Sequence, residues 1–435
     1  MTSENVTLPP KSPLRIANFR AYWIARLTMT LAQYAMLLII GWQTYNIARD
    51  GGMGVAEASG QLALIGLLQF VPLFILTPFS GWAADHFDRR NLGRLTVVLQ
   101  LACAVLLAWL TATETISIPW VFGIAILLGV ARAFAGPALS ALAPNLVPKA
   151  ILPNAIALSS ISWQVGMIVG PALGGYLHAV MPALPYIAAA VLFLVSASAL
   201  SFIGKVPQPP RPQNQRPIHA MIEGLRYVVR NRMVLGAITL DLFAVFLAGA
   251  TALFPVYARD ILEVGETGLA QLAMAPAVGA TVTALVFSFR PLKANVGPRM
   301  LWAVAIFGFA TIVFGFSTSM PLSLAMLFIV GAADMFSVYI RQSLIQLHTP
   351  DDKRGRVSSV SMLTISASNE FGDFFSGTLA YTIGPVAAVV SGGAGAIAIV
   401  ALWTRIFPVL RTTRTFDPPD NLIDHTHTPE KTRQE

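Results

Sequence analysis

Four carboxylic acids stand inside long apolar stretches of this chain: Asp241, Asp334, Glu370 and Asp373. Burial and a neighbouring like charge each favour the protonated form of a carboxyl group, so such residues can carry protons. Glu370 and Asp373 are three residues apart and would share one helix face, where they would titrate as a unit. We predict a proton-coupling site at this pair, with Asp241 or Asp334 as alternative carriers. Equally, neighbouring serine and asparagine side chains could satisfy both acids, which would then only fix helix packing.

Three arginines, Arg26, Arg132 and Arg341, lie in equally apolar surroundings. A charge is costly in lipid, so each should face a water-filled cavity or an oppositely charged partner. Together with Asp241 and Asp334, these arginines are our candidates to line a substrate cavity. An alternative of equal weight is that they form ion pairs that only lock helices together. Asp241 and Arg26 lie near enough to a helix end to extend toward water.

The composition places these charges in a membrane. Of the 435 residues, 55% are hydrophobic and 11% are charged, with a mean hydropathy of +0.66, whereas a soluble domain is about 25% charged. Twelve apolar runs are each long enough to cross a bilayer as a helix, which takes about 20 residues. The runs are Tyr22–Ile47, Gln61–Ala84, Asn91–Thr113, Ile118–Leu142, Ala155–Val180, Leu184–Gly204, Val234–Ala258, Leu269–Phe289, Met300–Ser319, Leu322–Gln346, Val357–Thr382 and Val386–Phe407.

The basic residues predict the orientation of these spans. Of the 29 lysines and arginines, only Arg49 and Arg259 would lie outside if the N-terminus is cytoplasmic, and three more lie within spans. Such an excess of basic residues marks the cytoplasmic side, so we predict that both termini are cytoplasmic. Because the net charge of +8 is distributed over these loops instead of one patch, we predict a lipid bilayer as the surroundings and no nucleic-acid partner.

Residues 205–232 form the one long polar connection, proline-rich at first and then amphipathic over Ile218–Arg232. Gly129–Leu177 aligns without gaps on Gly331–Leu379 at an offset of 202, which indicates a duplicated six-helix unit. We therefore predict an all-α integral membrane protein with twelve transmembrane helices in two pseudo-symmetric six-helix bundles. Its predicted parts are residues 1–204, 205–232, 233–408 and 409–435. At this offset Arg132 matches Asp334. If the two pair across the central pathway, neutralising one of them should harm transport more than neutralising both.

The fifth run carries closely spaced glycines and one proline: Gly166, Gly170, Pro171, Gly174 and Gly175. Glycines four residues apart make a smooth helix face on which another helix can pack closely. Pro171 removes one backbone hydrogen bond and permits a bend. We predict a helix-packing motif here.

The turn Gly81–Arg90 joins the second and third runs and gathers charge at one membrane face. It resembles the corresponding loop of the major facilitator superfamily, with the pattern Gly-x-x-x-Asp-Arg/Lys-x-Gly-Arg-Arg, although here His86 and Asp88 depart from it. The resemblance implies a cytoplasmic gate formed by Gly81, Asp85, Arg89 and Arg90. The alternative is that the basic residues only anchor the loop on the cytoplasmic side.

Three further stretches resemble exporters of this superfamily. The Gly-Pro motif of the fifth run is typical of proton antiporters, and Arg132-Ala133-Phe134-Ala135-Gly136 resembles the Arg-x-x-x-Gly motif of drug exporters. Ser337–Gly377 resembles the enterobactin-exporter-like branch, a bacterial group associated with siderophore and multidrug efflux. The resemblance implies a transporter of the bacterial cytoplasmic membrane that exports a siderophore or an amphipathic drug in exchange for protons.

Two other functions fit the same sequence. The first is a proton-coupled importer or uniporter on the same fold, and the second is a membrane sensor or assembly partner that transports nothing. The sequence contains no ATP-binding glycine-rich loop, metal-ligand cluster or nucleophile motif. We therefore expect no enzymatic activity, no cofactor and no metal site, with an ion gradient as the energy source and a monomer as the functional unit.

Overall fold

The computed structural model describes residues 12–204, 217–290, 292 and 294–416. In the first half, six long helices follow one another: α1 (Ala17–Asp50), α2 (Val55–His86), α3 (Arg89–Ala112), α4 (Ile118–Leu142), α5 (Leu152–Val180) and α6 (Leu184–Ser201). The second half contains both long and short helices: α7 (Pro217–Arg230), α8 (Arg232–Leu247), α9 (Phe254–Val256), α10 (Gly265–Phe289), α11 (Val296–Phe316), α12 (Met320–Leu347), α13 (Asp351–Ile383), α14 (Pro385–Ile406) and α15 (Pro408–Thr412).

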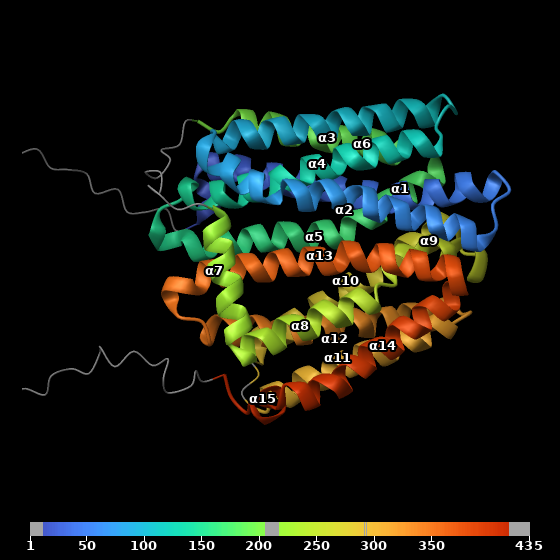
Figure 1. Cartoon of the computed structure of the whole chain (residues 1–435). Helices are drawn as coiled ribbons and strands as arrows, with labels where there is room; N and C mark the ends of the chain where they lie inside the picture. The colour runs from blue at the N-terminus through green and yellow to red at the C-terminus, as the bar shows by residue number, and fades with distance from the viewer. Residues whose placement is uncertain (1–11, 205–216, 291, 293, 417–435) are drawn as a thin grey trace, which may run out of the picture.

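Eleven stretches of the described residues form helices long and apolar enough to cross a membrane. They correspond to eleven of the predicted runs, with Arg232–Ile261 as the seventh span. The remaining long helix, α13, is more polar because it holds Glu370, Asp373 and many serines and threonines. Nevertheless α13 runs through the middle of the molecule, packed lengthwise against α2 (Figure 1). Three of its serines, Ser361, Ser368 and Ser376, are buried there and thus kept from lipid.

The long helices form two bundles that lie side by side (Figure 1). One hydrophobic core consists only of residues between Phe19 and Ile203, and a second only of residues between Val228 and Leu410. A third core joins the bundles, with Trp42 and Tyr45 of α1 against Phe254, Tyr257 and other residues of the second half. The bundles also meet along α2 with α13 and along α5 with α10.

Two glycines allow close helix crossings at matching places in the two bundles. A Cβ atom on Gly129 of α4 would collide with the backbone carbonyl of Gln69 in α2. A Cβ atom on Gly331 of α12 would collide with the backbone carbonyl of Pro276 in α10. Because Gly129 and Gly331 are paired by the 202-residue offset, the repeat in sequence is a repeat in packing.

The glycines of α5 face two different helices. Substituted Cβ atoms would lie 2.6 Å from Tyr34 Cβ for Gly170 and 2.8 Å from the Ala35 carbonyl oxygen for Gly174, so both pack against α1. Gly166 also meets α1, whereas a Cβ on Gly175 would lie 2.6 Å from Ala270 Cβ in α10. Pro171 is buried within α5. This helix thus joins the core of its own bundle to the opposite bundle.

Helix α7 crosses one end of the bundles (Figure 1). Its Tyr227 hydroxyl donates to the His348 carbonyl at 2.7 Å, and its Glu223 accepts from Arg356 at 2.5 Å. These contacts fasten α7 to the turn after α12 and to the start of α13. We call this side the α7 end of the molecule. The opposite side, where α1 ends at Asp50, is called the latch end after the ion pairs described below.

The seventh span is not one continuous helix. After α8 ends at Leu247, residues 248–250 have no helical structure. A 3-10 turn over Thr251–Leu253 follows, then α9 and a π-helical turn over Tyr257–Ile261. The sequence predicted a single run over Val234–Ala258, so this break is a finding of the structure.

Candidate functional site

An ion pair in the interior connects the two bundles. Arg132 of α4 donates from Nη2 to Glu370 Oε1 of α13 at 2.7 Å and from Nη1 to Gln69 Oε1 of α2 at 3.1 Å. The side chains of Arg132 and Glu370 are 33% and 14% exposed. Since both sit in the interior of membrane-spanning helices, each charge is stabilised chiefly by its partner.

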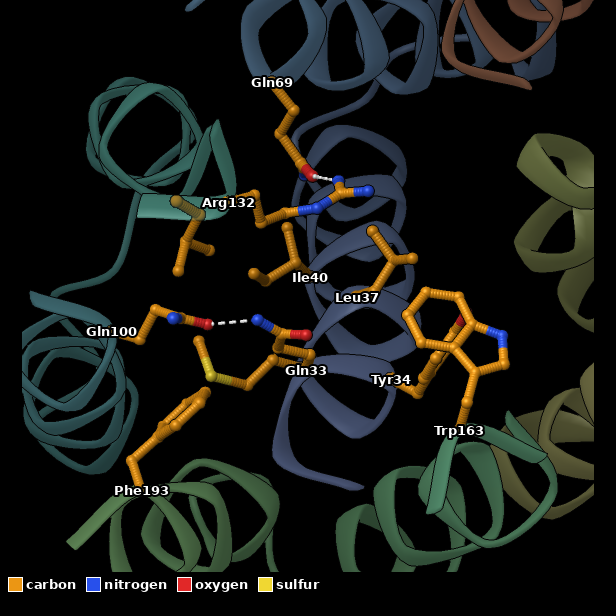
Figure 2. Close-up of a pocket in the computed structure, with 11 residues that line it drawn as sticks. Gln33, Tyr34, Leu37, Ile40, Gln69, Gln100, Arg132, Trp163 and Phe193 are labelled. Carbon is orange, nitrogen blue, oxygen red and sulfur yellow. Dashed lines mark hydrogen bonds between the residues drawn. The ribbon is translucent and has the colours of Figure 1, made fainter. Parts of the chain in front are cut away.

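Beside Arg132 lies a small pocket within the first bundle, with an accessible volume of about 90 Å³ (Figure 2). Gln33 donates to Gln100 at 2.6 Å across its floor. The rings of Tyr34 and Trp163 meet edge to face with centroids 5.7 Å apart. The other lining residues are Met36, Leu37, Ile40, Gln69, Leu128 and Phe193. The walls thus combine aromatic and aliphatic surface with three amides and one guanidinium.

This pocket is smaller than the roughly 300–1,000 Å³ of a site for a drug-sized ligand. A substrate larger than a few atoms would therefore have to extend beyond it, past Arg132 and the exposed ring of Trp163, which is 46% accessible. The chemistry of the walls suits an amphipathic molecule, because apolar surface supplies contact area and a few polar groups fix orientation.

Asp373, the second acid of the predicted proton site, has a different partner from Glu370. Its Oδ1 accepts a hydrogen bond of 2.9 Å from the Thr251 hydroxyl, at the start of the helical turn after the break in the seventh span. The partners of the two acids therefore come from other helices, Arg132 for Glu370 and Thr251 for Asp373. The alternative in which neighbouring serine and asparagine side chains satisfy the pair is not what the structure shows.

The other charges predicted for a substrate cavity lie apart from this pocket. Asp241 of α8 and Arg341 of α12 form an ion pair inside the second bundle, with side chains only 10% and 3% exposed. Asp334 of α12 is half-buried and forms no ion pair among the described residues. The hypothetical pairing of Arg132 with Asp334 is therefore not what the structure shows, because Arg132 is paired with Glu370.

Arg26 of α1 also stays within its own helix. Its Nη1 donates to the Tyr22 hydroxyl at 3.2 Å, and its buried Nε has no hydrogen-bond partner within the described part of the chain. Asp241 is held by Arg341 and does not extend to water. The structure thus separates the five predicted cavity residues: Arg132 lines the pocket of Figure 2, and the others lie elsewhere.

The predicted cytoplasmic gate is described in part. The surroundings of Gly81 and the side chain of Asp85 lie outside what the structure describes, and Arg89 has contacts within the protein. Asp88 caps α3 by accepting from the Arg90 backbone at 2.9 Å and from the Arg90 guanidinium at 2.6 Å. These hydrogen bonds hold the pKa of Asp88 below its usual value. Arg90 also donates to the Ile203 carbonyl at 3.0 Å, which ties this turn to the end of α6.

A group of charges at the latch end was not predicted as a site. Arg49 of α1 binds Asp260 at 2.8 Å, and Arg259 binds Asp50 of α1 at 2.6 Å. The Tyr45 hydroxyl donates to Asp260 at 2.5 Å. We call these five residues the latch. Both bundles contribute the same tripeptide, Ala-Arg-Asp, at residues 48–50 and 258–260, and each arginine pairs with the aspartate of the other bundle.

The sequence contained a signal for the latch. Arg49 and Arg259 are the two arginines that the predicted orientation leaves outside. Each is followed directly by an aspartate, which balances the charge of the arginine. Their cross-pairing depends on how the bundles dock, and a repeat of three residues was too short to reveal it.

Comparison with known proteins places the chain among transporters. Residues 9–430 match the model of the transmembrane secretion effector family. The multidrug efflux pump Tap of Mycobacterium tuberculosis H37Rv is 27% identical over 389 residues, which cover 86% of this chain and 86% of that protein. The enterobactin exporter EntS of Escherichia coli O1:K1 is 24% identical over 413 residues, which cover 91% of this chain and 97% of that protein.

Solved structures share the fold. A bacterial homolog of the human lysosomal transporter Spinster, inward-facing and occupied, superposes with a TM-score of 0.71 at 16% identity, covering 93% of this chain and 100% of that chain. A D-xylose-proton symporter gives a TM-score of 0.67 at 14% identity, covering 89% of this chain and 98% of that chain. The predicted twelve-helix architecture of the major facilitator type is thereby confirmed.

Proposed function

This chain belongs to the transmembrane secretion effector family of the major facilitator superfamily, and we propose that it exports a small organic molecule in exchange for protons. It is a multi-pass membrane transporter and not an enzyme. The relatives that are named a multidrug efflux pump and an enterobactin exporter support export as the direction. The proposed substrate is an amphipathic drug or a siderophore, in keeping with the mixed walls of the pocket.

The observation that carries the proton coupling is the ion pair between Arg132 and Glu370. It crosses from one bundle to the other in the interior of the membrane-spanning region. Protonation of Glu370 would remove its charge, weaken the bridge and free the guanidinium of Arg132 to bind substrate. Loss of the proton would restore the bridge. The two bundles would then be joined or released according to whether a proton is bound, which alternating access requires.

The basic residues support a location in the bacterial cytoplasmic membrane with both termini and the α7 end in the cytoplasm. The latch would then close the outward side. Cysteines introduced as Glu114→Cys and Gln213→Cys should react with an impermeant maleimide from opposite sides of the membrane. Reaction of both from the same side would contradict this orientation. We propose that the unit is a monomer, which the mass of the purified protein in detergent would test.

The coupling can be tested in everted vesicles with an acidic interior. Vesicles that contain the protein should accumulate an amphipathic dye such as ethidium, and Glu370→Gln should abolish this accumulation while leaving dye binding measurable. Asp373→Asn is the second variant, because either acid can carry the proton. Full accumulation by both variants would show that the proton site lies elsewhere, with Asp334 as the next candidate.

The direction of transport separates export from the importer or uniporter alternative. Accumulation in everted vesicles, driven by an acidic interior, is the behaviour of an exporter. Accumulation only in right-side-out vesicles would indicate import, and equilibration without dependence on the proton gradient would indicate a uniporter.

A further inference from the structure

The break in the seventh span needs a physical explanation. Residues 248–250 leave the helix inside the span Arg232–Ile261. Backbone groups that are not hydrogen-bonded are costly at membrane depth, so such a break persists only where protein or a cavity surrounds it. Here two helices, α13 and α14, pack closely against it: a Cβ on Gly249 would lie 3.2 Å from the backbone of Gly372, and a Cβ on Gly392 would lie 3.2 Å from Ala248 Cα.

Asp373 caps the helical segment that begins after the break. Its carboxylate accepts a hydrogen bond of 2.9 Å from the hydroxyl of Thr251, the first residue of that segment. A carboxylate is favourable at this place because the first N–H groups of a helical segment have no intrahelical acceptor and carry partial positive charge. The contact joins α13 to the start of residues 251–261, which we call the outer half-helix.

The outer half-helix ends in the latch. Arg259 and Asp260 lie about 13 Å along it from Thr251, at about 1.5 Å per residue. Between cap and latch, the Tyr257 hydroxyl donates to the Gly315 carbonyl at 2.8 Å and holds the segment against α11. The segment thus connects the contact with Asp373 at one end to two latch residues at the other.

We propose that Asp373 controls the latch through the outer half-helix. When its carboxylate is ionised, the hydrogen bond from Thr251 holds the segment and keeps the latch closed. When the carboxyl group is neutral, this hydrogen bond loses its charge assistance, which is roughly half its strength, and the latch opens. This inference rests on the proposed function in one respect: Asp373 must be able to bind a proton during transport.

The surroundings of Asp373 contain few other groups that could produce the same effect. Glu370 lies one helical turn away on α13, and Arg132 reaches this region from α4. The facing segment contributes Thr251, and α2 contributes Gly66, which brings no charge. Since both charged neighbours are paired with each other, substitutions of Thr251 test the cap without disturbing them.

The test measures whether the latch is open, independently of transport. Ala258 is fully buried beside the latch residues, so Ala258→Cys reports access to the latch through labelling by an impermeant maleimide. Ala48→Cys on α1 is a second reporter in case the first does not fold. The sole native cysteine, Cys103, is buried and is replaced by alanine. The full-length protein is used in membrane vesicles with the latch end accessible.

Thr251→Val and Asp373→Asn should each raise the labelling rate about tenfold, since a hydrogen bond to a charged group commonly shifts an equilibrium by that order. The double variant should label no faster than the faster single variant, because both changes remove the same contact. Thr251→Ser, which keeps the hydroxyl, should label as the parent does. So should Thr378→Val, a control on α13 whose hydroxyl binds only within its own helix.

Asp260→Asn, which breaks the latch directly, serves as the positive control and should increase labelling. If it does so while Thr251→Val and Asp373→Asn label like the parent, the inference is overturned. Additive increases in the double variant would also overturn it. If the cap variants open the latch but Asp373→Asn and Glu370→Gln both retain full gradient-driven dye accumulation, the proposed proton coupling fails and the mechanical link stands.

Discussion

The first and the seventh spans are counterparts in the two bundles, yet they are built differently. Helix α1 runs without interruption over 34 residues, whereas the seventh span breaks at residues 248–250. Both end in the same Ala-Arg-Asp tripeptide, and those ends pair with each other across the bundles. The two spans thus share the same ending but differ in continuity. The uninterrupted copy can hold its half of the latch still, and the broken copy can move.

The same contrast extends to the charges. The first bundle supplies the positive partner of the central ion pair, Arg132, and the second supplies the negative one, Glu370. At the offset of the repeat, Pro171 of α5 corresponds to Asp373 of α13, so a buried proline in one copy stands where the other has an acid. The two halves are alike in scaffold and complementary in chemistry. Function should therefore be most sensitive where the complementary groups meet.

The largest effect is expected at that meeting point. Arg132→Gln and Glu370→Gln should each reduce gradient-driven dye transport by about 100-fold, because each leaves a charge without its partner in a low-dielectric interior. The double variant should regain thermal stability relative to either single variant but remain uncoupled. The measurements are dye accumulation in vesicles and the melting temperature of the purified protein, with Glu57→Gln at the far end of α2 as control. Strictly additive losses of stability would contradict the pairing.

A second prediction separates the buried ion pair of the second bundle from the central one. Asp241→Asn leaves Arg341 charged and buried, so we expect a loss of about 3–5 kcal/mol in the free energy of unfolding. This pair lies within one bundle, so the substitution should lower the melting temperature and the amount of folded protein. Whatever folds should still transport in proportion to its amount. A selective loss of turnover at normal stability would instead place Asp241 in the transport pathway.

The third prediction tests the structural likeness of the halves. Gly129→Ala and Gly331→Ala should each cost about 1–3 kcal/mol of stability, since each adds a methyl group where a neighbouring backbone already touches the helix. Gly136→Ala on α4 is the matched control, because nothing lies within 4 Å of a Cβ there. Melting temperatures measure all three. A large loss at one glycine and none at its counterpart would show that the repeat has diverged in packing.

The sequence was sufficient to predict the fold because a lipid bilayer restricts which segments can cross it. Each span must be long and apolar, and hydropathy therefore located the runs. The break at 248–250 could not be seen, since Ala248-Gly249-Ala250 is as apolar as a helix interior and its cap, Asp373, is distant in sequence. The four acids could be singled out as candidate sites because burying a charge in an apolar span is costly. Their partners were not found, because the docking of the bundles decides which charges meet, and the repeat pointed instead to Asp334.

The smallest effect concerns the two halves of the latch, which look alike in sequence but differ in burial. The pair of Arg49 and Asp260 is 26% and 17% exposed and includes the Tyr45 hydroxyl, whereas Asp50 in the other pair is 69% exposed. Asp260→Asn should therefore cost about 1–2 kcal/mol, because a partly buried acceptor loses two charge-assisted hydrogen bonds. Asp50→Asn should change stability by less than about 0.5 kcal/mol, as exposed pairs usually do.

Salt sharpens this last comparison. Screening acts on exposed charges far more than on buried ones, and the Debye length falls to about 3 Å at 1 M salt. Whatever contribution Asp50 makes should disappear in 1 M sodium chloride, while most of the Asp260 contribution should remain. The measurement is the melting temperature of both variants and the parent in detergent at low and high salt. Equal losses for the two aspartates at both salt concentrations would mean that the two ion pairs of the latch contribute equally to stability, and the difference in burial between them would then have no effect.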